Sequence, residues 1–185
     1  KGKLCNFDCI YCECGWNKDG ISDKVFPSFE DVSAALNERI SSMAKDGVPV
    51  DSITFSGNGE PTLHPDFSAI IDLTLSLRDR YYPEAKVSVL SNATLVGRKN
   101  VAEALKKVDN PILKIDGSSD ELVAMMNKPS GHYRLAEIVE ALKGFEGRFV
   151  LQTMFLRSPE FDTASPEALG RWMDIVRELK PREIM

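Results

Sequence analysis

Residues 50–77 read VDSITFSGNGEPTLHPDFSAIIDLTLSL, and the fold class follows from the pattern of this stretch. It opens with a short apolar run, Val50 to Phe55, that has the length and composition of a β-strand. A glycine-containing loop follows, and a helix is predicted to begin at Asp66, because apolar residues then recur at helical spacing. A strand, a loop and a helix in this order form the repeating unit of an α/β protein.

The same alternation continues on both sides of this unit. Ser28 and Ser165 are candidate N-caps of further helices. The other predicted elements are helices over 28–47, 101–108, 135–142 and 165–179, and strands over 87–90, 112–115 and 149–156. Residues 127–132 are predicted to form a polar connecting loop after a strand. Parallel strands joined by helices predict either a (β/α) barrel, complete or partial, or an open doubly wound sheet.

The composition is that of one globular domain. The chain has 185 residues, of which 43% are apolar and 28% are charged, so we predict a single domain over residues 1–185. The sequence shows no membrane-spanning run and no secretory signal, which predicts a cytoplasmic protein without a membrane partner. The net charge of −5 disfavours a broad nucleic-acid surface. Because the chain begins at Lys1 and ends on an apolar stretch at Ile184, we expect it to be a fragment of a longer protein.

All four cysteines lie within ten residues, at Cys5, Cys9, Cys12 and Cys14. Such crowding cannot staple distant segments together, so it indicates metal binding and not a disulfide framework. The first three cysteines have C-x3-C-x2-C spacing, and thiolates are soft ligands that suit an iron–sulfur cluster or zinc. A cubane cluster normally takes four cysteines, so three would leave one iron open to a small molecule.

The competing interpretations of these residues are weaker. Cys14 is spaced too tightly from Cys12 to suit two irons of one cube, and we expect it to be a bystander. A structural zinc site usually needs a second pair of ligands, and the chain offers only His64 and His132 beyond the cysteine run. His64 is expected to cap the turn that follows it and not to act as an acid or base.

The loop after the first predicted strand, residues 56–65, carries a carboxylate beside glycines. A nucleotide-binding G-x-G-x-x-G pattern fails here, because Thr62 stands where the third glycine should be. Glycines at a strand end permit close backbone approach, and Glu60 beside them suits a cationic group of a ligand.

Together, these two motifs resemble those of the radical S-adenosylmethionine (radical SAM) superfamily. The cysteine spacing with Tyr11 before the last cysteine matches the family signature, and Asn-Gly-Glu at 58–60 matches its Gly-Gly-Glu motif, with Asn58 as a departure. The resemblance implies a TIM-type (β/α)6 barrel, here partial, truncated at both ends and without its first strand. It also implies a 4Fe–4S cluster on the first three cysteines, whose open iron binds SAM. Reductive cleavage of SAM would then give a 5′-deoxyadenosyl radical that abstracts hydrogen from a substrate.

The resemblance further implies positions for cofactor-binding residues. They are Tyr11 near the adenine, Gly59 and Glu60 at the SAM amino group, Asn92 at the ribose or carboxylate, and Gln152 at the ribose. Alternation along the strand over 112–115 adds Lys114 and Asp116 as candidates for cofactor or substrate contact, if their face is the barrel interior. For Asn92 the alternative is an ordinary turn former. For Asp116 the alternative is a solvated pair with Lys114, which alternation places on the same face of its strand.

The sequence leaves the substrate open. The longer runs around both motifs are similar to the branch that contains the tRNA wyosine-synthesis enzymes and uncharacterised relatives, which implies a tRNA base as one substrate. A glycyl-radical partner protein, as for an activase, and a small metabolite are the alternatives. The family implies a reductant protein of the flavodoxin or ferredoxin type as a partner. A zinc or iron–sulfur binding module without catalysis is the interpretation from a different functional class.

Overall fold

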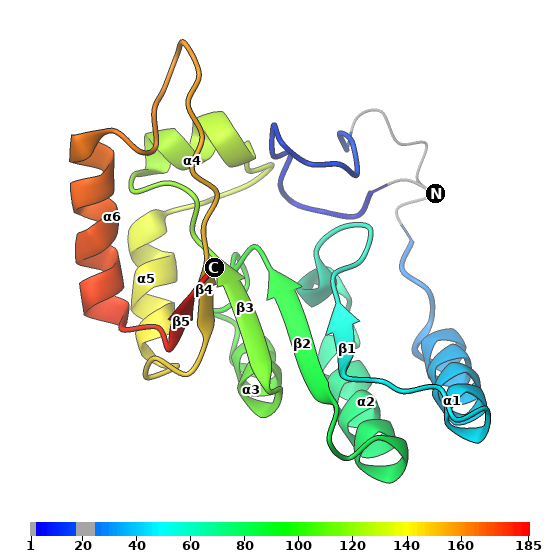
Figure 1. Cartoon of the computed structure of the whole chain (residues 1–185). Coiled ribbons are helices and arrows are strands. Elements are labelled where there is room, and N and C mark those ends of the chain that lie inside the picture. The colour runs from blue at the N-terminus through cyan, green and yellow to red at the C-terminus, as the bar shows by residue number, and fades with distance from the viewer. Residues whose placement is uncertain (1–2, 18–24) are drawn as a thin grey trace.

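The computed structural model describes residues 3–17 and 25–185 and shows an α/β fold built on one parallel sheet (Figure 1). The strands are β1 (Ser52–Phe55), β2 (Lys86–Ser91), β3 (Asn110–Lys114), β4 (Val150–Gln152) and β5 (Glu183–Ile184). The helices are α1 (Phe29–Lys45), α2 (Phe67–Tyr81), α3 (Lys99–Lys107), α4 (Asp120–Asn127), α5 (Leu135–Lys143) and α6 (Pro166–Leu179), with a short 3₁₀ helix, η1 (Pro61–Leu63). The predicted α/β class is confirmed.

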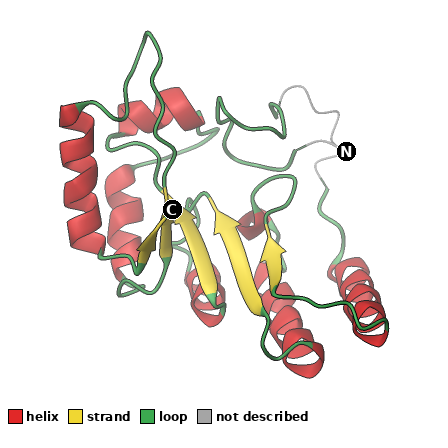
Figure 2. Ribbon diagram, viewed as in Figure 1, coloured by secondary structure: helices red, strands yellow, loops and turns green. Residues whose placement is uncertain are grey.

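The order of the strands distinguishes between the two predicted architectures. All neighbouring strands are parallel, and their order in the sheet, β1-β2-β3-β4-β5, is also their order along the chain. A doubly wound sheet reverses its order at a switch point, whereas a barrel adds each strand beside the one before it. The described residues therefore form part of a (β/α) barrel, with α2, α3, α5 and α6 packed outside the sheet and α4 at the carboxyl ends of its strands (Figure 2).

The two faces of the sheet carry different side chains. On the outer face, alternate strand residues such as Val89, Leu113 and Leu151 are fully buried against the helices and form the core. The residues between them point to the inner face. There Lys114 of β3 and Gln152 of β4 are partners in the sheet register. Polar side chains thus reach the inner face at the carboxyl ends of the strands.

The helices begin largely where the sequence predicts. Ser28 caps α1 by accepting a hydrogen bond from Asp31 N, and Ser165 caps α6 by accepting one from Ala168 N. Helix α2 begins after Asp66, although the Asp66 side chain makes no capping hydrogen bond. Among the described residues, no helix combines the length and the apolar character needed to span a membrane.

Two segments near the site differ from the prediction. Residues 128–132 follow helix α4 and not a strand, and Asn127 is the last residue of that helix. Ser119 is the N-cap of α4, and its side chain accepts a hydrogen bond from Leu122 N. The strand predicted over 149–156 ends at Gln152. Beyond it the chain folds back on itself, with Thr163 N donating to Leu156 O at 3.0 Å, so these residues cannot continue the ladder.

Candidate functional site

The cysteine loop, residues 4–15, lies over the carboxyl ends of the strands (Figure 1). Leu4 forms a parallel bridge with the loop that follows β1. Asp8 N and Ile10 N donate hydrogen bonds to the last carbonyls of α4. Phe7, between these anchor points, is 3% exposed. Contacts within the protein therefore hold the loop at the edge of the sheet where the inner-face polar groups emerge.

Gly59 is the point at which the cysteine loop meets the end of β1. Leu4 N donates to Asn58 O at 3.1 Å, and Glu60 N donates to Leu4 O at 2.8 Å. Gly59 has a φ of +150°, and a Cβ on this residue would lie 1.9 Å from Leu4 O. Only glycine permits so close an approach, so backbone packing is sufficient to explain this residue. Contact between Gly59 and SAM stays a prediction.

Glu60 is a buried carboxylate with four hydrogen-bond donors around it. It is 4% exposed. Its Oε1 accepts from Thr62 N at 3.0 Å, from Thr62 Oγ1 at 2.6 Å and from Ser91 Oγ at 2.8 Å, while its Oε2 accepts from Asn92 N at 2.7 Å. Each donor is uncharged, so within the described residues these bonds orient the carboxylate without neutralising it.

Asn92, just after β2, links Glu60 to the cysteine loop. Its Nδ2 donates to Asn6 Oδ1 at 2.7 Å and lies 3.8 Å from Cys5 Sγ. Its Oδ1 accepts from Thr94 N at 3.1 Å, which is the Asx turn of the alternative interpretation. Asn92 therefore forms a turn and also contacts the cysteine loop, because its two polar side-chain atoms serve different partners.

Tyr11, Asp116 and Asn127 form a second hydrogen-bonded group, at the end of β3. Tyr11 OH donates to Asp116 Oδ2, and Asn127 Nδ2 donates to the same oxygen at 2.7 Å. Asp116 Oδ1 accepts from Met154 N at 2.8 Å, and Lys114 Nζ lies 3.9 Å away from it. Asp116 is 3% exposed, so its pair with Lys114 is present but buried at the carboxylate and not solvated as the alternative held. Burial and the Asp116 carboxylate raise the pKa of Tyr11, which keeps its hydroxyl a donor.

The thiols of the loop have the donor chemistry of a soft metal site. Cys5, Cys9 and Cys12 are partly buried, and Cys14 is exposed. Burial raises the pKa of the Cys5 thiol to about 11 and also raises the pKa of Cys9, so a metal must displace thiol protons when it binds. Over residues 3–17 and 25–185, no three Cys, His, Asp or Glu side chains already surround one metal position. The three thiols fit an iron–sulfur cluster in kind and number.

Two further side chains at the loop escaped the sequence-based prediction. Lys3 is 5% exposed, and its Nζ lies 3.4 Å from Asp8 Oδ1. Burial lowers the pKa of Lys3, but the nearby Cys12, Cys5 and Asp8 raise it by more, so the ammonium group stays charged beside the thiols. Asn127 is the last residue of α4, a helix that was itself not predicted. A lysine and an asparagine at these positions carry no motif that could have marked them.

Gln152 stands apart from the other predicted residues. It ends β4, and its Nε2 lies 3.7 Å from Met185 Sδ. Its link to the site is its position beside Lys114 in the sheet register. The structure therefore brings Tyr11, Gly59, Glu60, Asn92 and Asp116 together around the cysteine loop through hydrogen bonds or backbone contacts, and leaves Gln152 on the neighbouring strand.

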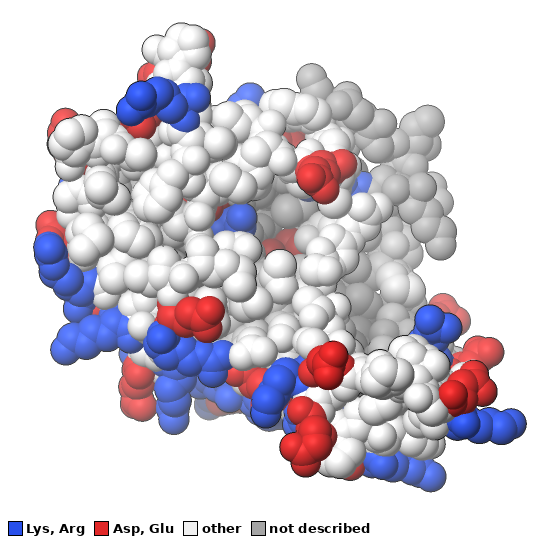
Figure 3. Space-filling model, viewed as in Figure 1, with Lys and Arg blue, Asp and Glu red and all other residues white. Residues whose placement is uncertain are grey.

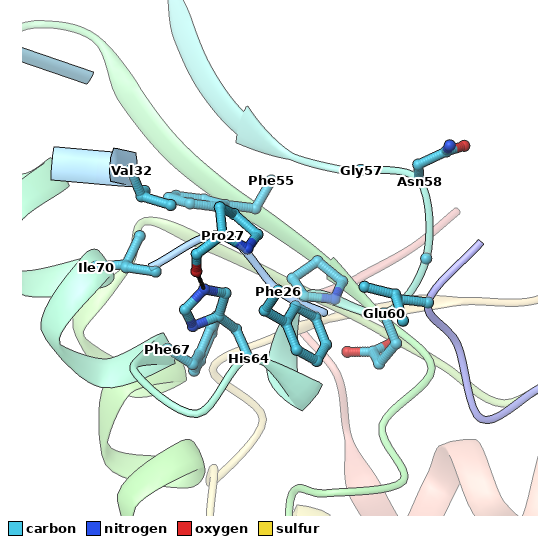
Figure 4. A pocket seen from close by; sticks show the side chains of 13 residues that line it. Phe26, Pro27, Val32, Phe55, Gly57, Asn58, Glu60, His64, Phe67 and Ile70 are labelled. Atoms are coloured by element: carbon cyan, nitrogen blue, oxygen red, sulfur yellow. Dashed lines mark hydrogen bonds between the residues drawn. The ribbon is translucent and has the colours of Figure 1, made fainter. Parts of the chain in front are cut away.

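A cavity of about 330 Å³ lies beside Glu60, between β1 and the segment that leads into α1 (Figure 4). Its wall is mostly apolar and includes Leu4, Phe26, Pro27, Val32, Phe55, Phe67 and Ile70. His64 closes one side, because its Nε2 donates to Pro27 O at 3.0 Å while its Nδ1 accepts from Asp66 N at 3.0 Å. His64 therefore caps the following turn, as predicted.

Charge is unevenly spread over the molecule. On the face shown in Figure 3, basic and acidic side chains gather together along the lower edge, where the strands begin, and the middle of the face is largely uncharged. This uncharged region is hollowed, and a basic and an acidic side chain lie inside the hollow. Recessed polar groups within an uncharged rim are typical of cofactor and substrate sites.

Comparison with known proteins agrees with this arrangement. A UPF0026 protein of Methanocaldococcus jannaschii is 28% identical over 187 residues, which cover 98% of this chain and 54% of that protein. A radical SAM methyltransferase from Sphaerobacter thermophilus has a similar structure, with a TM-score of 0.57, 13% identity, and coverage of 98% of this chain and 63% of that one. The structure of BtrN in complex with AdoMet and 2-DOIA has a TM-score of 0.50, 16% identity, and coverage of 82% and 53%.

The family assignment rests on the sequence match over most of the chain. The sequence profile described as the Radical SAM superfamily matches residues 2–160, a range that includes the cysteine loop, Glu60 and strands β1 to β4. The chain spans about half the length of the M. jannaschii relative, 54%. The sequential parallel strands and the cysteine loop across their carboxyl ends are consistent with the match. This chain belongs to the radical SAM superfamily.

Proposed function

We propose that the full-length protein is a radical SAM enzyme in which Cys5, Cys9 and Cys12 hold a 4Fe–4S cluster and the residues around Glu60 bind SAM. When bound, this cofactor pair supplies a one-electron reductive cleavage that yields a 5′-deoxyadenosyl radical for hydrogen abstraction. A protein of the flavodoxin or ferredoxin type is the proposed source of the electron. The chain's own part is to bind and orient the cofactors and to exclude water.

One observation carries the proposal: Glu60 is a buried, oriented carboxylate beside the cysteine loop. A carboxylate in such a place is tolerated only when it is hydrogen-bonded, and its four donors are uncharged. Oε1 accepts three of these hydrogen bonds and Oε2 accepts one, so with respect to the described residues Oε2 keeps a free acceptor position. The amino group of SAM is a cation that would fit this position.

Asn92 supports the proposal that the cluster and SAM lie next to each other. Its backbone N–H holds Glu60, and its side-chain Nδ2 lies 3.8 Å from Cys5 Sγ. A ligand that bridges the open iron and Glu60 would therefore pass Asn92. Tyr11 and Asp116 are proposed to contact the same ligand, since they join the cysteine loop to the end of β3. Gly59 and Gln152 are proposed cofactor contacts as well, although Gln152 lies outside the hydrogen-bonded groups.

The test is product formation by the full-length protein. After anaerobic reconstitution with iron and sulfide, dithionite and SAM should produce 5′-deoxyadenosine. Glu60→Gln keeps the shape of the side chain and should retain the cluster while weakening SAM binding about tenfold or more, because the charge is lost. Glu121→Gln, in the exposed first turn of α4, is the matched control and should bind SAM normally. An intact cluster without any 5′-deoxyadenosine, or bound zinc in place of iron, would contradict the proposal.

A tRNA base is the proposed substrate class, supported by the similarity of both motifs to the wyosine-synthesis branch. Membership of that branch is part of the proposal. Untargeted nucleoside analysis of RNA from a deletion strain tests it directly. A modified nucleoside that disappears on deletion and returns on complementation would support the proposal, and unchanged nucleoside pools would contradict it.

A further inference from the structure

Asn127 brings a side-chain N–H group to the sulfur of Cys9. Asn127 is 1% exposed, and its Nδ2 lies 3.3 Å from Cys9 Sγ, 3.1 Å from Tyr11 OH and 2.7 Å from Asp116 Oδ2. A side-chain amide has two N–H protons. Asp116 Oδ2 already accepts the Tyr11 proton, so it is an acceptor and takes one of the two. The orientation of the amide is thereby set, and its second proton is directed at Cys9 and the Tyr11 oxygen.

The backbone around Cys9 is held by the same helix end. Asp8 N donates to Asn127 O at 2.9 Å, and Ile10 N donates to Met126 O at 2.8 Å. The last carbonyls of a helix have no partner within the helix. Here the amides on either side of Cys9 supply those partners. The end of α4 therefore determines where the Cys9 sulfur lies, and the Asn127 amide meets it there.

Cys9 has the closest side-chain N–H donor of the three predicted ligands among the described residues. Cys5 Sγ accepts from the backbone of Phe7 at 3.4 Å, and the Asn92 amide is 3.8 Å from it. The Asn127 amide approaches Cys9 more closely, at 3.3 Å. Hydrogen bonds to the sulfurs are among the factors that set the potential of an iron–sulfur cluster.

We propose that Asn127 is a positioning residue that donates a hydrogen bond to the Cys9 ligand and makes the cluster easier to reduce. The inference rests on the proposed function. Reduction adds one electron to the cluster and spreads negative charge onto its sulfur ligands, so an N–H donor stabilises the reduced form more than the oxidised form. Asn127 forms and breaks no covalent bond in this role, and it changes only the reduction equilibrium of the cluster.

The experiment is a redox titration of the reconstituted full-length protein with dithionite, monitored by electron paramagnetic resonance without SAM. Asn127→Leu removes the donor at similar volume. At a fixed solution potential we expect the ratio of reduced to oxidised cluster to fall about tenfold, equivalent to a potential lower by about 59 mV for a one-electron couple. Asn127→Gln keeps an amide and should recover part of the difference.

Ser119→Ala is the matched structural control. It removes the N-cap of the same helix, where Ser119 Oγ accepts from Leu122 N at 3.3 Å, and it lies at the opposite end of α4 from Cys9. Its potential should equal that of the wild type. A shift of the same size in Ser119→Ala, or equal potentials in Asn127→Leu and the wild type with equal iron content, would overturn the inference and leave the proposed function intact. A wild-type protein that binds no cluster would instead overturn the proposed function.

Asn127→Leu can fail to assemble a cluster, because Asp116 also loses a donor. In that case, the inference is tested on the wild-type protein. With asparagine labelled with nitrogen-15, pulsed electron paramagnetic resonance of the reduced cluster should show a nitrogen coupling stronger than the more distant Asn92 amide can give. The absence of that coupling would overturn the inference.

Discussion

Gly59→Ala tests how the cysteine loop is attached to the sheet. The new Cβ would lie 1.9 Å from Leu4 O and 2.5 Å from Leu4 C, against both the oxygen and the carbon of one peptide group. Carbon and oxygen that are not bonded to each other normally stay more than about 3 Å apart, so Leu4 would have to retreat by roughly 1 Å. Neither group is the flexible end of a side chain, so the backbone itself must move.

The free-energy cost of Gly59→Ala can be calculated from the hydrogen bonds that this movement breaks and from the backbone strain that alanine adds. The two hydrogen bonds between Leu4 and residues 58–60 are 3.1 and 2.8 Å long, and a retreat of that size breaks both. Each contributes about 0.5–1.5 kcal/mol. Alanine at a φ of +150° adds about 1–3 kcal/mol of strain. We therefore expect a local cost of about 2–6 kcal/mol, which detaches the start of the cysteine loop and leaves the pairing of β1 with β2 intact.

The assay compares cluster content and thermal unfolding of the reconstituted full-length protein. Gly59→Ala should bind much less iron and sulfide than the wild type while it keeps its far-ultraviolet circular dichroism. Gly57→Ala is the matched control, since it lies in the same loop and a Cβ there has nothing within 4 Å. If Gly59→Ala incorporates as much iron as Gly57→Ala, the cysteine loop does not depend on this backbone contact and the reasoning is refuted.

Three further predictions concern titration and packing. Because burial raises the Cys5 pKa to about 11, the rate of alkylation of Cys5 in the metal-free protein should increase about tenfold per pH unit between pH 8 and 10. A rate that is flat over this range would contradict the inference that burial raises this pKa. Burial raises the pKa of Asp109, but Val87 N–H and Arg78 lower it by more, so it lies below its ordinary value. A lowered pKa adds stability at neutral pH that is lost as the pH falls below about 4, so Asp109→Asn should show a smaller loss on acidification in denaturant titrations than the wild type. Phe149 is fully buried, so Phe149→Ala should lower the free energy of unfolding by about 3–5 kcal/mol, and a loss below 1 kcal/mol would show that the core closes around the cavity.

The strands and most helices were predictable because their signals are local. Ser28 and Ser165 bind the backbone of the next few residues, so a short window of sequence contains both partners. Helix α4 was missed because it is eight residues long and offers little room for a helical period to repeat. Strand β4 was predicted too long, because the turn-back at Leu156 and Thr163 is made by contacts that alternation of apolar residues does not reveal.

In the candidate site, too, some features were predictable from local sequence and others depend on tertiary contacts. The cysteine spacing and the carboxylate beside glycines lie on short segments, so both motifs were readable before any fold was known. The proximity of Glu60 to the cysteine loop was not, because it depends on the bridge between Leu4 and Gly59. Gln152 was grouped with the other cofactor residues. In the structure its Nε2 lies 3.7 Å from Met185 Sδ, and its contact with a cofactor stays a prediction.

The amino-acid sequence alone was sufficient to predict the class of fold, the three candidate cysteine ligands and the loop that carries Glu60. Each of these predictions depends on residues that are close together along the chain. The choice between a barrel and a doubly wound sheet needed the strand order, which no local pattern encodes. The partnership of Asn127 with Cys9 likewise joins residues 118 positions apart. Such contacts arise only when the chain closes on itself, because loop closure brings together groups whose separation in sequence carries no information about their distance in space.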